Sequence, residues 1–190
     1  MLDKRYYWDD VSDEIGKLFL RYFHKDMAIC EVGFASGHFL EFLEASGYYN
    51  LTGIEIREEQ FKITENRFRN NQMKTKLINA DVFDISHQFD AIYSTGLIQC
   101  FDEKNRQKLF EHLSKIGNIA IFTVPVIESD RNAESIEKTA VAGCKEYCTG
   151  SLLYELSNYY DSVHEGFISK DLTKLDDDFL YFVCMRKNNI

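Results

Sequence analysis

Residues 27–40 constrain the fold most, because they join a buried strand to a helix through a loop of small residues. An apolar run at 28–32 predicts a short buried strand that carries one acidic residue, Glu31. The loop after it contains Gly33 and Gly37, which permit backbone angles and close approaches that a side chain forbids. From residue 39 onward the apolar residues have helical spacing. This order is typical of the turn that brings an α/β sheet close to a nucleotide-like ligand.

The rest of the chain alternates short apolar strands with amphipathic helices. This alternation indicates a Rossmann-like, doubly wound α/β sheet with helices on both faces. The last two strands are expected to form an antiparallel hairpin, because no helical pattern separates them. Further strands are predicted at 51–56, 76–78, 89–94, 119–124, 162–168 and 179–185, and helices at 8–23, 58–70, 102–116 and 152–160.

We expect one domain over residues 1–190, with residues 1–25 as an N-terminal helix or lid. Residues 126–148 break the alternation and predict an insertion over the carboxyl edge of the sheet. In the helix at 58–70, Phe61, Ile63 and Phe68 are expected to form the inner face.

The net charge of −9 disfavours nucleic acid as a partner, because proteins that grip phosphates usually present a basic face. No apolar run approaches the roughly 20 residues that span a bilayer. The N-terminus is charged and has no apolar core, so it does not resemble a signal peptide. Five scattered cysteines are most simply interpreted as reduced thiols. We therefore expect a cytoplasmic protein with no membrane association.

Polar residues follow the predicted strands where a parallel sheet presents its carboxyl ends. Glu55 closes the second strand, Asp81 follows the third, and Ser94 and Thr95 end the fourth. Open α/β sheets bind their ligands at this edge. A nicotinamide-binding domain would prefer a G-x-G-x-x-G loop, which this chain matches poorly.

Taken in order, these segments resemble class I S-adenosylmethionine-dependent methyltransferases of the small-molecule type. The resemblance covers residues 27–125 and rests on EVGFASG, GIEI, NADVFD, FDAIYSTGLIQCF and FTVPV. It implies a seven-stranded sheet of order 3-2-1-4-5-7-6 and S-adenosylmethionine as the cofactor. Ala35 replaces the middle glycine of the family's loop, a change that still permits close backbone approach.

The resemblance also implies a role for each matching position. Glu31 and the loop would border the methionine and ribose moieties, Glu55 would bind the ribose hydroxyls, and Asp81 would accept the adenine amine. Ser94 and Thr95 would line the methionine portion through their backbone. The remaining cofactor-binding candidates are the loop residues Gly33, Phe34, Ala35 and Gly37, and the adenine-flanking Ile56, Val82 and Phe83.

Gln99 and Tyr7 are the candidates for orienting the methyl acceptor. Gln99 stands where family members often have histidine or glutamate, which puts a general base there in doubt. Tyr7 belongs to an aromatic cluster at 6–8 that fits a lid and a hydrophobic anchor equally well. No metal site is expected, because Cys144 and Cys148 lack two further ligands with zinc-site spacing.

The acceptor is expected to be a small metabolite methylated on oxygen or nitrogen. A phosphorylated or nucleotide-linked sugar-like compound is one option, with Arg131, Lys138 and Lys145 as the nearest cations, and an apolar or phenolic acceptor is another. Two other function classes stay open, a non-catalytic partner subunit of this fold and a nicotinamide-dependent oxidoreductase. The oligomeric state is open as well.

Overall fold

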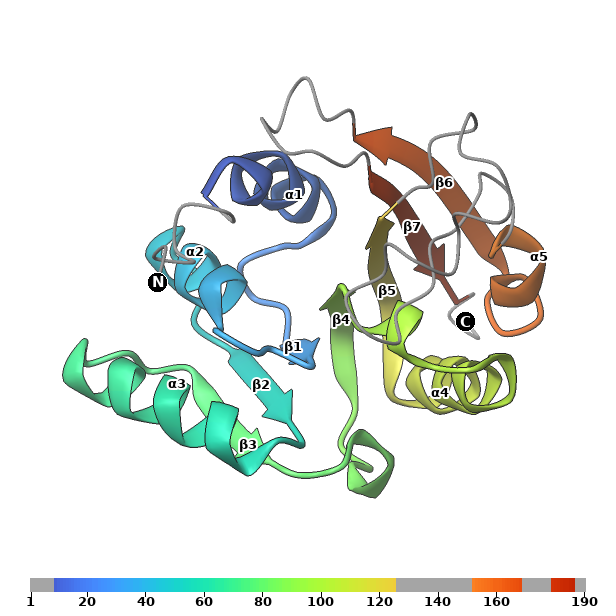
Figure 1. Ribbon diagram of the computed structural model, residues 1–190. Helices are drawn as coiled ribbons and strands as arrows, with labels where there is room; N and C mark the ends of the chain where they lie inside the picture. Colours follow the sequence, from blue (N-terminus) through green and yellow to red (C-terminus); the bar gives the residue numbers. More distant parts are fainter. Residues whose placement is uncertain (1–8, 126–151, 169–178, 187–190) are drawn as a thin grey trace, which may run out of the picture.

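A twisted sheet lies between two layers of helices in the computed structural model, which describes residues 9–125, 152–168 and 179–186 (Figure 1). Its order is β3-β2-β1-β4-β5-β7-β6. Neighbouring strands from β3 to β5 are parallel, and β7 is antiparallel to both β5 and β6. The predicted fold class and strand order are therefore confirmed. The strands are β1 (Ile29–Val32), β2 (Leu51–Glu55), β3 (Lys76–Asn79), β4 (Phe89–Thr95), β5 (Gly117–Pro125), β6 (Ser162–Ile168) and β7 (Phe179–Met185).

Alternate residues of the central strands enter two separate cores, because successive side chains of a strand point to opposite faces of the sheet. In β1, Ile29 belongs to one core while Cys30 and Val32 belong to the other. Helices α1 (Asp9–Tyr22), α2 (His38–Ala45) and α3 (Glu58–Asn70) contribute side chains to the first core. Helices α4 (Glu103–Ile116) and α5 (Leu153–Leu156) contribute to the second.

Helix α4 shows how local sequence sets a boundary. Asp102 caps its first turn, where its Oδ1 accepts a hydrogen bond of 2.8 Å from the backbone N–H of Asn105. Leu109, Phe110 and Leu113 lie on one side of the helix and are fully buried. Their spacing of three and four residues predicts this face.

Two sequence-based expectations are wrong. Ile63 was expected inside α3 but is 58% exposed, whereas Thr64 takes the buried position beside Phe68. The helix expected at 152–160 is reduced to the single turn of α5, and the Oγ of Ser157 hydrogen-bonds back to the carbonyl of Leu153. Serine side chains compete with the backbone ladder in this way and weaken helix propagation.

Several predicted features lie outside the described residues: Tyr7, the insertion at 126–148 with its cations, Cys144 and Cys148. No helix in the part of the chain that the structure describes is long and apolar enough to cross a membrane. Within the same residues, no group of three or more histidine, cysteine or acidic side chains is placed to hold a metal ion.

Candidate functional site

The loop between β1 and α2 has an unusual backbone. Gly33, Ala35 and Gly37 have φ values of 74°, 45° and 68°, in the left-handed region that favours glycine. Ala35 thus keeps a glycine-like conformation without being glycine. The N–H of Gly33 donates to the carbonyl of Ile54 at 2.8 Å, which draws the loop toward β2.

Helix α3 holds this loop from the other side. The carbonyl of Ala35 accepts hydrogen bonds from Thr64 Oγ1 at 2.8 Å and Gln60 Nε2 at 3.0 Å. Arg67 donates to the carbonyl of Ser36. Sequence reasoning missed these three residues, although their spacing along α3 places them on one helix face. The loop is therefore pinned between β2 and α3 before any ligand arrives.

Glu55, at the end of β2, is connected directly to the loop. Its Oε2 accepts a hydrogen bond of 3.1 Å from the backbone N–H of Ala35. Its Oε1 accepts from both the backbone N–H and the Nε of Arg57, at 2.9 and 3.1 Å. Burial opposes ionisation of Glu55, but the bonds from Arg57 outweigh it and lower the pKa of the carboxyl. Glu55 is thus an ionised, oriented acceptor, and Arg57 is a contact that the sequence did not predict.

Glu31, at the end of β1, has the opposite electrostatic character. It is 2% exposed, and its Oε2 accepts a hydrogen bond of 3.0 Å from the hydroxyl of Tyr93 on β4. Burial raises the pKa of Glu31 to about 8, the bond from Tyr93 opposes that rise, and the charge of Glu55 adds to it. Two neighbouring acidic strand ends therefore differ in charge at neutral pH.

Asp81 follows β3 and begins the short helix η2 (Val82–Asp84). Its Oδ1 accepts a hydrogen bond of 3.0 Å from the backbone N–H of Phe83. Its other oxygen makes no hydrogen bond within the described part of the chain. Val82 is buried, whereas Ile56, at the end of the neighbouring strand, exposes 62% of its surface. An acceptor oxygen and an exposed apolar side chain thus stand on adjacent strand ends.

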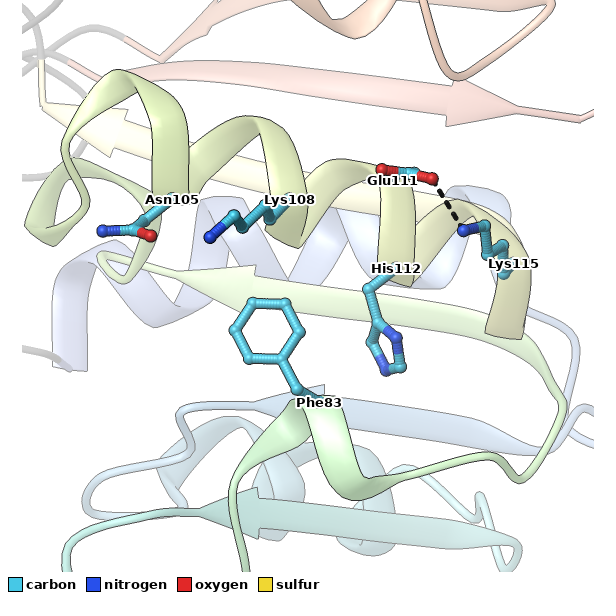
Figure 2. Close-up of a pocket in the computed structure, with 6 residues that line it drawn as sticks. All are labelled: Phe83, Asn105, Lys108, Glu111, His112 and Lys115. Atoms are coloured by element: carbon cyan, nitrogen blue, oxygen red, sulfur yellow. Dashed lines mark hydrogen bonds and ion pairs between the residues drawn. The ribbon is translucent and has the colours of Figure 1, made fainter.

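Phe83 faces helix α4. Its ring centroid lies 5.4 Å from that of His112, which is half-buried. Both rings line a hollow of ≈ 410 Å³ between η2 and α4. Figure 2 shows them beside Lys108 and the Glu111–Lys115 ion pair. Of the predicted site residues, only Phe83 lines this hollow. The hollow is therefore separate from the loop and strand ends where the other candidates meet.

The exit of β4 completes the arrangement. Ser94 is fully buried and its Oγ has no hydrogen-bond partner among the described residues. Gln99, in the short helix η3 (Ile98–Cys100), is 9% exposed, and its Oε1 also has no hydrogen-bond partner among the described residues. The side chain of Leu97 packs against Gly33. A Cβ added to Gly33 would stand 3.1 Å from Cδ2 of Leu97. Sequence reasoning missed Leu97, although an apolar residue directly after Thr95-Gly96 was a usable signal.

Two contacts bring the predicted candidates together: Ala35 with Glu55, and Gly33 with Leu97 beside Ser94 and Thr95. The carboxyl ends of β1, β2 and β4 thus form one site at the switch point of the sheet, where the strand order reverses between β1 and β4 while the two strands stay parallel. A left-handed small-residue loop with acidic strand ends, on a sheet of order 3-2-1-4-5-7-6, defines the Rossmann-like methyltransferase fold.

Comparison with known proteins agrees with this fold. Residues 29–117 match a family model described as a methyltransferase domain. No curated protein is similar to the chain in sequence. Residues 29–117 are therefore similar to a methyltransferase domain, and the chain has the Rossmann-like methyltransferase fold.

Three solved structures illustrate the likeness. Magnesium protoporphyrin IX methyltransferase from Synechocystis PCC 6803, with bound S-adenosylmethionine, is 13% identical, with 96% of this chain and 82% of that chain covered and a TM-score of 0.72. An S-adenosylmethionine-dependent methyltransferase from Clostridium acetobutylicum ATCC 824 is 13% identical, with 97% and 96% covered and a TM-score of 0.70. Phosphoethanolamine N-methyltransferase 2 from Haemonchus contortus is 10% identical, with 93% and 52% covered and a TM-score of 0.76.

Proposed function

We propose that this protein transfers the methyl group of S-adenosylmethionine to an oxygen or nitrogen of a small metabolite. The observation that carries the proposal is the 3.1 Å hydrogen bond from Ala35 to Glu55, which joins the left-handed loop to an ionised carboxylate. A ribose diol needs an oriented acceptor of this kind.

The other strand-end residues fit the remaining parts of the cofactor. Asp81 has a free carboxylate oxygen for an exocyclic amine, and the exposed Ile56 offers an apolar surface for a flat base. Glu31 and the loop would border the methionine portion, together with the backbone of Ser94 and Thr95. The further loop and adenine-side candidates are Gly33, Phe34, Gly37, Val82 and Phe83.

Arg57 has to leave Glu55 when the cofactor binds. A carboxylate offers about four lone-pair sites, and here they receive the backbone N–H groups of Ala35 and Arg57 and the Nε and Nη2 of Arg57. The two backbone bonds can stay, while the ribose hydroxyls replace the guanidinium. The Arg57 side chain is 64% exposed, so its release costs little.

When bound, the cofactor would supply a methyl group activated by its sulfonium, and in-line attack by the acceptor on that methyl carbon would break the C–S bond and release the neutral thioether. The protein's task is then to position the acceptor and exclude water. Gln99 suits this task, because its buried Oε1 is an unpaired hydrogen-bond acceptor next to the exit of β4. This oxygen would accept a hydrogen bond from the hydroxyl or amine of the methyl acceptor and so orient that group toward the methyl donor. Tyr7 stays a second candidate for the same role.

The acceptor class is proposed from the family and its structural neighbours. Two of the neighbours named above act on small molecules, a magnesium porphyrin and phosphoethanolamine. The net charge of −9 disfavours nucleic acid. A phosphorylated or nucleotide-linked sugar-like compound is therefore our first choice for screening, with phenolic compounds as the second.

Isothermal titration with S-adenosylmethionine tests the proposal. Glu55→Gln should weaken binding at least about tenfold, because hydrogen bonds to a charged group contribute about 1.5–3 kcal/mol. Arg57→Gln should strengthen it by up to about fivefold, since an ion pair made by a largely exposed arginine is worth about 0.2–1 kcal/mol. Glu58→Gln is the control, because among the described residues Glu58 pairs only with exposed Lys62.

Absence of heat with both S-adenosylmethionine and its demethylated product would contradict the proposal, and NAD(H) or NADP(H) binding would support an oxidoreductase. Transfer of a labelled methyl group to a screened metabolite separates an enzyme from a non-catalytic partner subunit.

A further inference from the structure

Glu31 is a carboxyl group placed where an ordinary carboxylate would be unstable. It lies two residues before Gly33, where the loop at 33–37 begins, and is 2% exposed. In the parallel register of β1 and β4 it lies opposite Tyr93, and the Tyr93 hydroxyl donates to it at 3.0 Å. A buried carboxylate with a single neutral donor is poorly compensated for the loss of water.

The groups around Glu31 add negative charge or none. Tyr93 is backed by the ring of Phe19 from α1 and by that of Phe23 just after α1, whose centroids lie 4.4 and 6.0 Å from its own. Glu55 on β2 is ionised and repels a second negative charge.

On β1 itself the neighbour is Cys30, whose thiol stays neutral because burial raises its pKa. Among the described residues no basic side chain hydrogen-bonds to Glu31 or forms an ion pair with it. The geometry alone therefore favours the protonated acid at neutral pH, and the raised pKa of about 8 agrees with it.

The proposed ligand brings the missing charge. S-adenosylmethionine carries a positive sulfonium and a positive ammonium on its methionine portion, whereas its demethylated product keeps only the ammonium. A cation near a buried carboxyl favours ionisation, even without direct contact, because the surroundings screen weakly.

We propose that Glu31 is a charge-sensing carboxyl, which holds a proton in the free protein and releases it to solvent when S-adenosylmethionine binds. This inference rests on the proposed function. The balance is simple: a neutral acid and a cationic ligand give an internal ion pair and one free proton. The site then favours the sulfonium cofactor over its neutral-sulfur product, because only the former supplies both positive charges. Product release is assisted when Glu31 takes a proton back.

Proton release can be measured directly, with no need for catalysis. Titration of S-adenosylmethionine at pH 7 in two buffers of different ionisation enthalpy gives the number of protons exchanged on binding. For the wild type we expect close to one proton released with S-adenosylmethionine and a smaller number with the product. The dissociation constant should fall as pH rises from 6 to 8, by up to about tenfold per unit.

Two variants identify the group. Glu31→Gln should bind with no proton release and a flat pH profile, and it should discriminate less between the two ligands. Tyr93→Phe should keep the release, because it removes only a bond that favours the ionised form. Wild-type binding of S-adenosylmethionine without proton release, or unchanged release in Glu31→Gln, overturns the inference and leaves the proposed function intact. Failure of both ligands to bind overturns both.

Discussion

Replacing Gly37 by alanine tests whether the loop and α3 are packed as closely as the structure shows. Gly37 has a φ of 68° and begins α2 as its N-cap. A Cβ there would lie 2.9 Å from Cζ of Phe68 and 3.0 Å from Cγ2 of Thr64. These neighbours are 3% and 1% exposed, so they have no free space into which to move. The change should therefore add a steric cost to a conformational one.

The size of the effect follows from two contributions. A left-handed conformation costs a non-glycine residue about 1–2 kcal/mol, and overpacking a close-packed region costs about 1–3 kcal/mol. Gly37→Ala should thus reduce the free energy of unfolding by about 2–5 kcal/mol. Since Thr64 also holds the carbonyl of Ala35, the same change should weaken S-adenosylmethionine binding.

Gly47→Ala is the matched control. Gly47 has a φ of 86°, but a Cβ there would meet only the flexible side chain of Lys25, at 3.3 Å. It should carry the conformational cost of about 1–2 kcal/mol and no packing cost. Urea unfolding followed by circular dichroism gives both values. Equal destabilisation by the two changes would refute the packing of the loop against α3.

Three further outcomes follow from the structure. Glu31 has a pKa raised from 4.5 to about 8, so its contribution to stability is present below pH 4.5 and is lost as pH rises through about 8. In thermal melts, the melting temperature of Glu31→Gln should therefore rise relative to that of the wild type between pH 5 and 8. A constant difference between the two would argue against a buried acid. Arg106 and Glu155 form a largely buried ion pair of 2.8 Å between α4 and α5, so Glu155→Ala alone should cost up to about 3–5 kcal/mol. The double change Arg106→Met with Glu155→Leu should recover much of this in urea unfolding, and a single change without effect would contradict the burial. Ile63→Ala should change the free energy of unfolding by no more than about 0.5 kcal/mol, whereas Phe68→Ala should lower it by about 3–5 kcal/mol. Similar losses from both changes would indicate that Ile63 lies on the buried face of α3 after all.

The elements of the fold could be predicted because their signals are local. Buried strands such as β5 are continuous apolar runs, and α4 has buried residues at helical spacing after a capping aspartate. Ile63 was misplaced because an apolar residue was assumed to point inward. In the folded protein the loop needs a hydrogen-bond donor at the next position, so Thr64 faces it and Ile63 turns to solvent.

The sequence by itself determined the strand order through family resemblance and the nature of the strand-end residues through their spacing. Only the tertiary structure decided how those residues act on each other. Glu31 and Glu55 are the same residue type at equivalent strand ends, yet one is ionised and the other is not at neutral pH. The difference comes from partners distant in sequence or unsuspected, such as Tyr93 and Arg57. Burial and neighbouring charge set the state of a carboxyl group, and both exist only once the chain has folded.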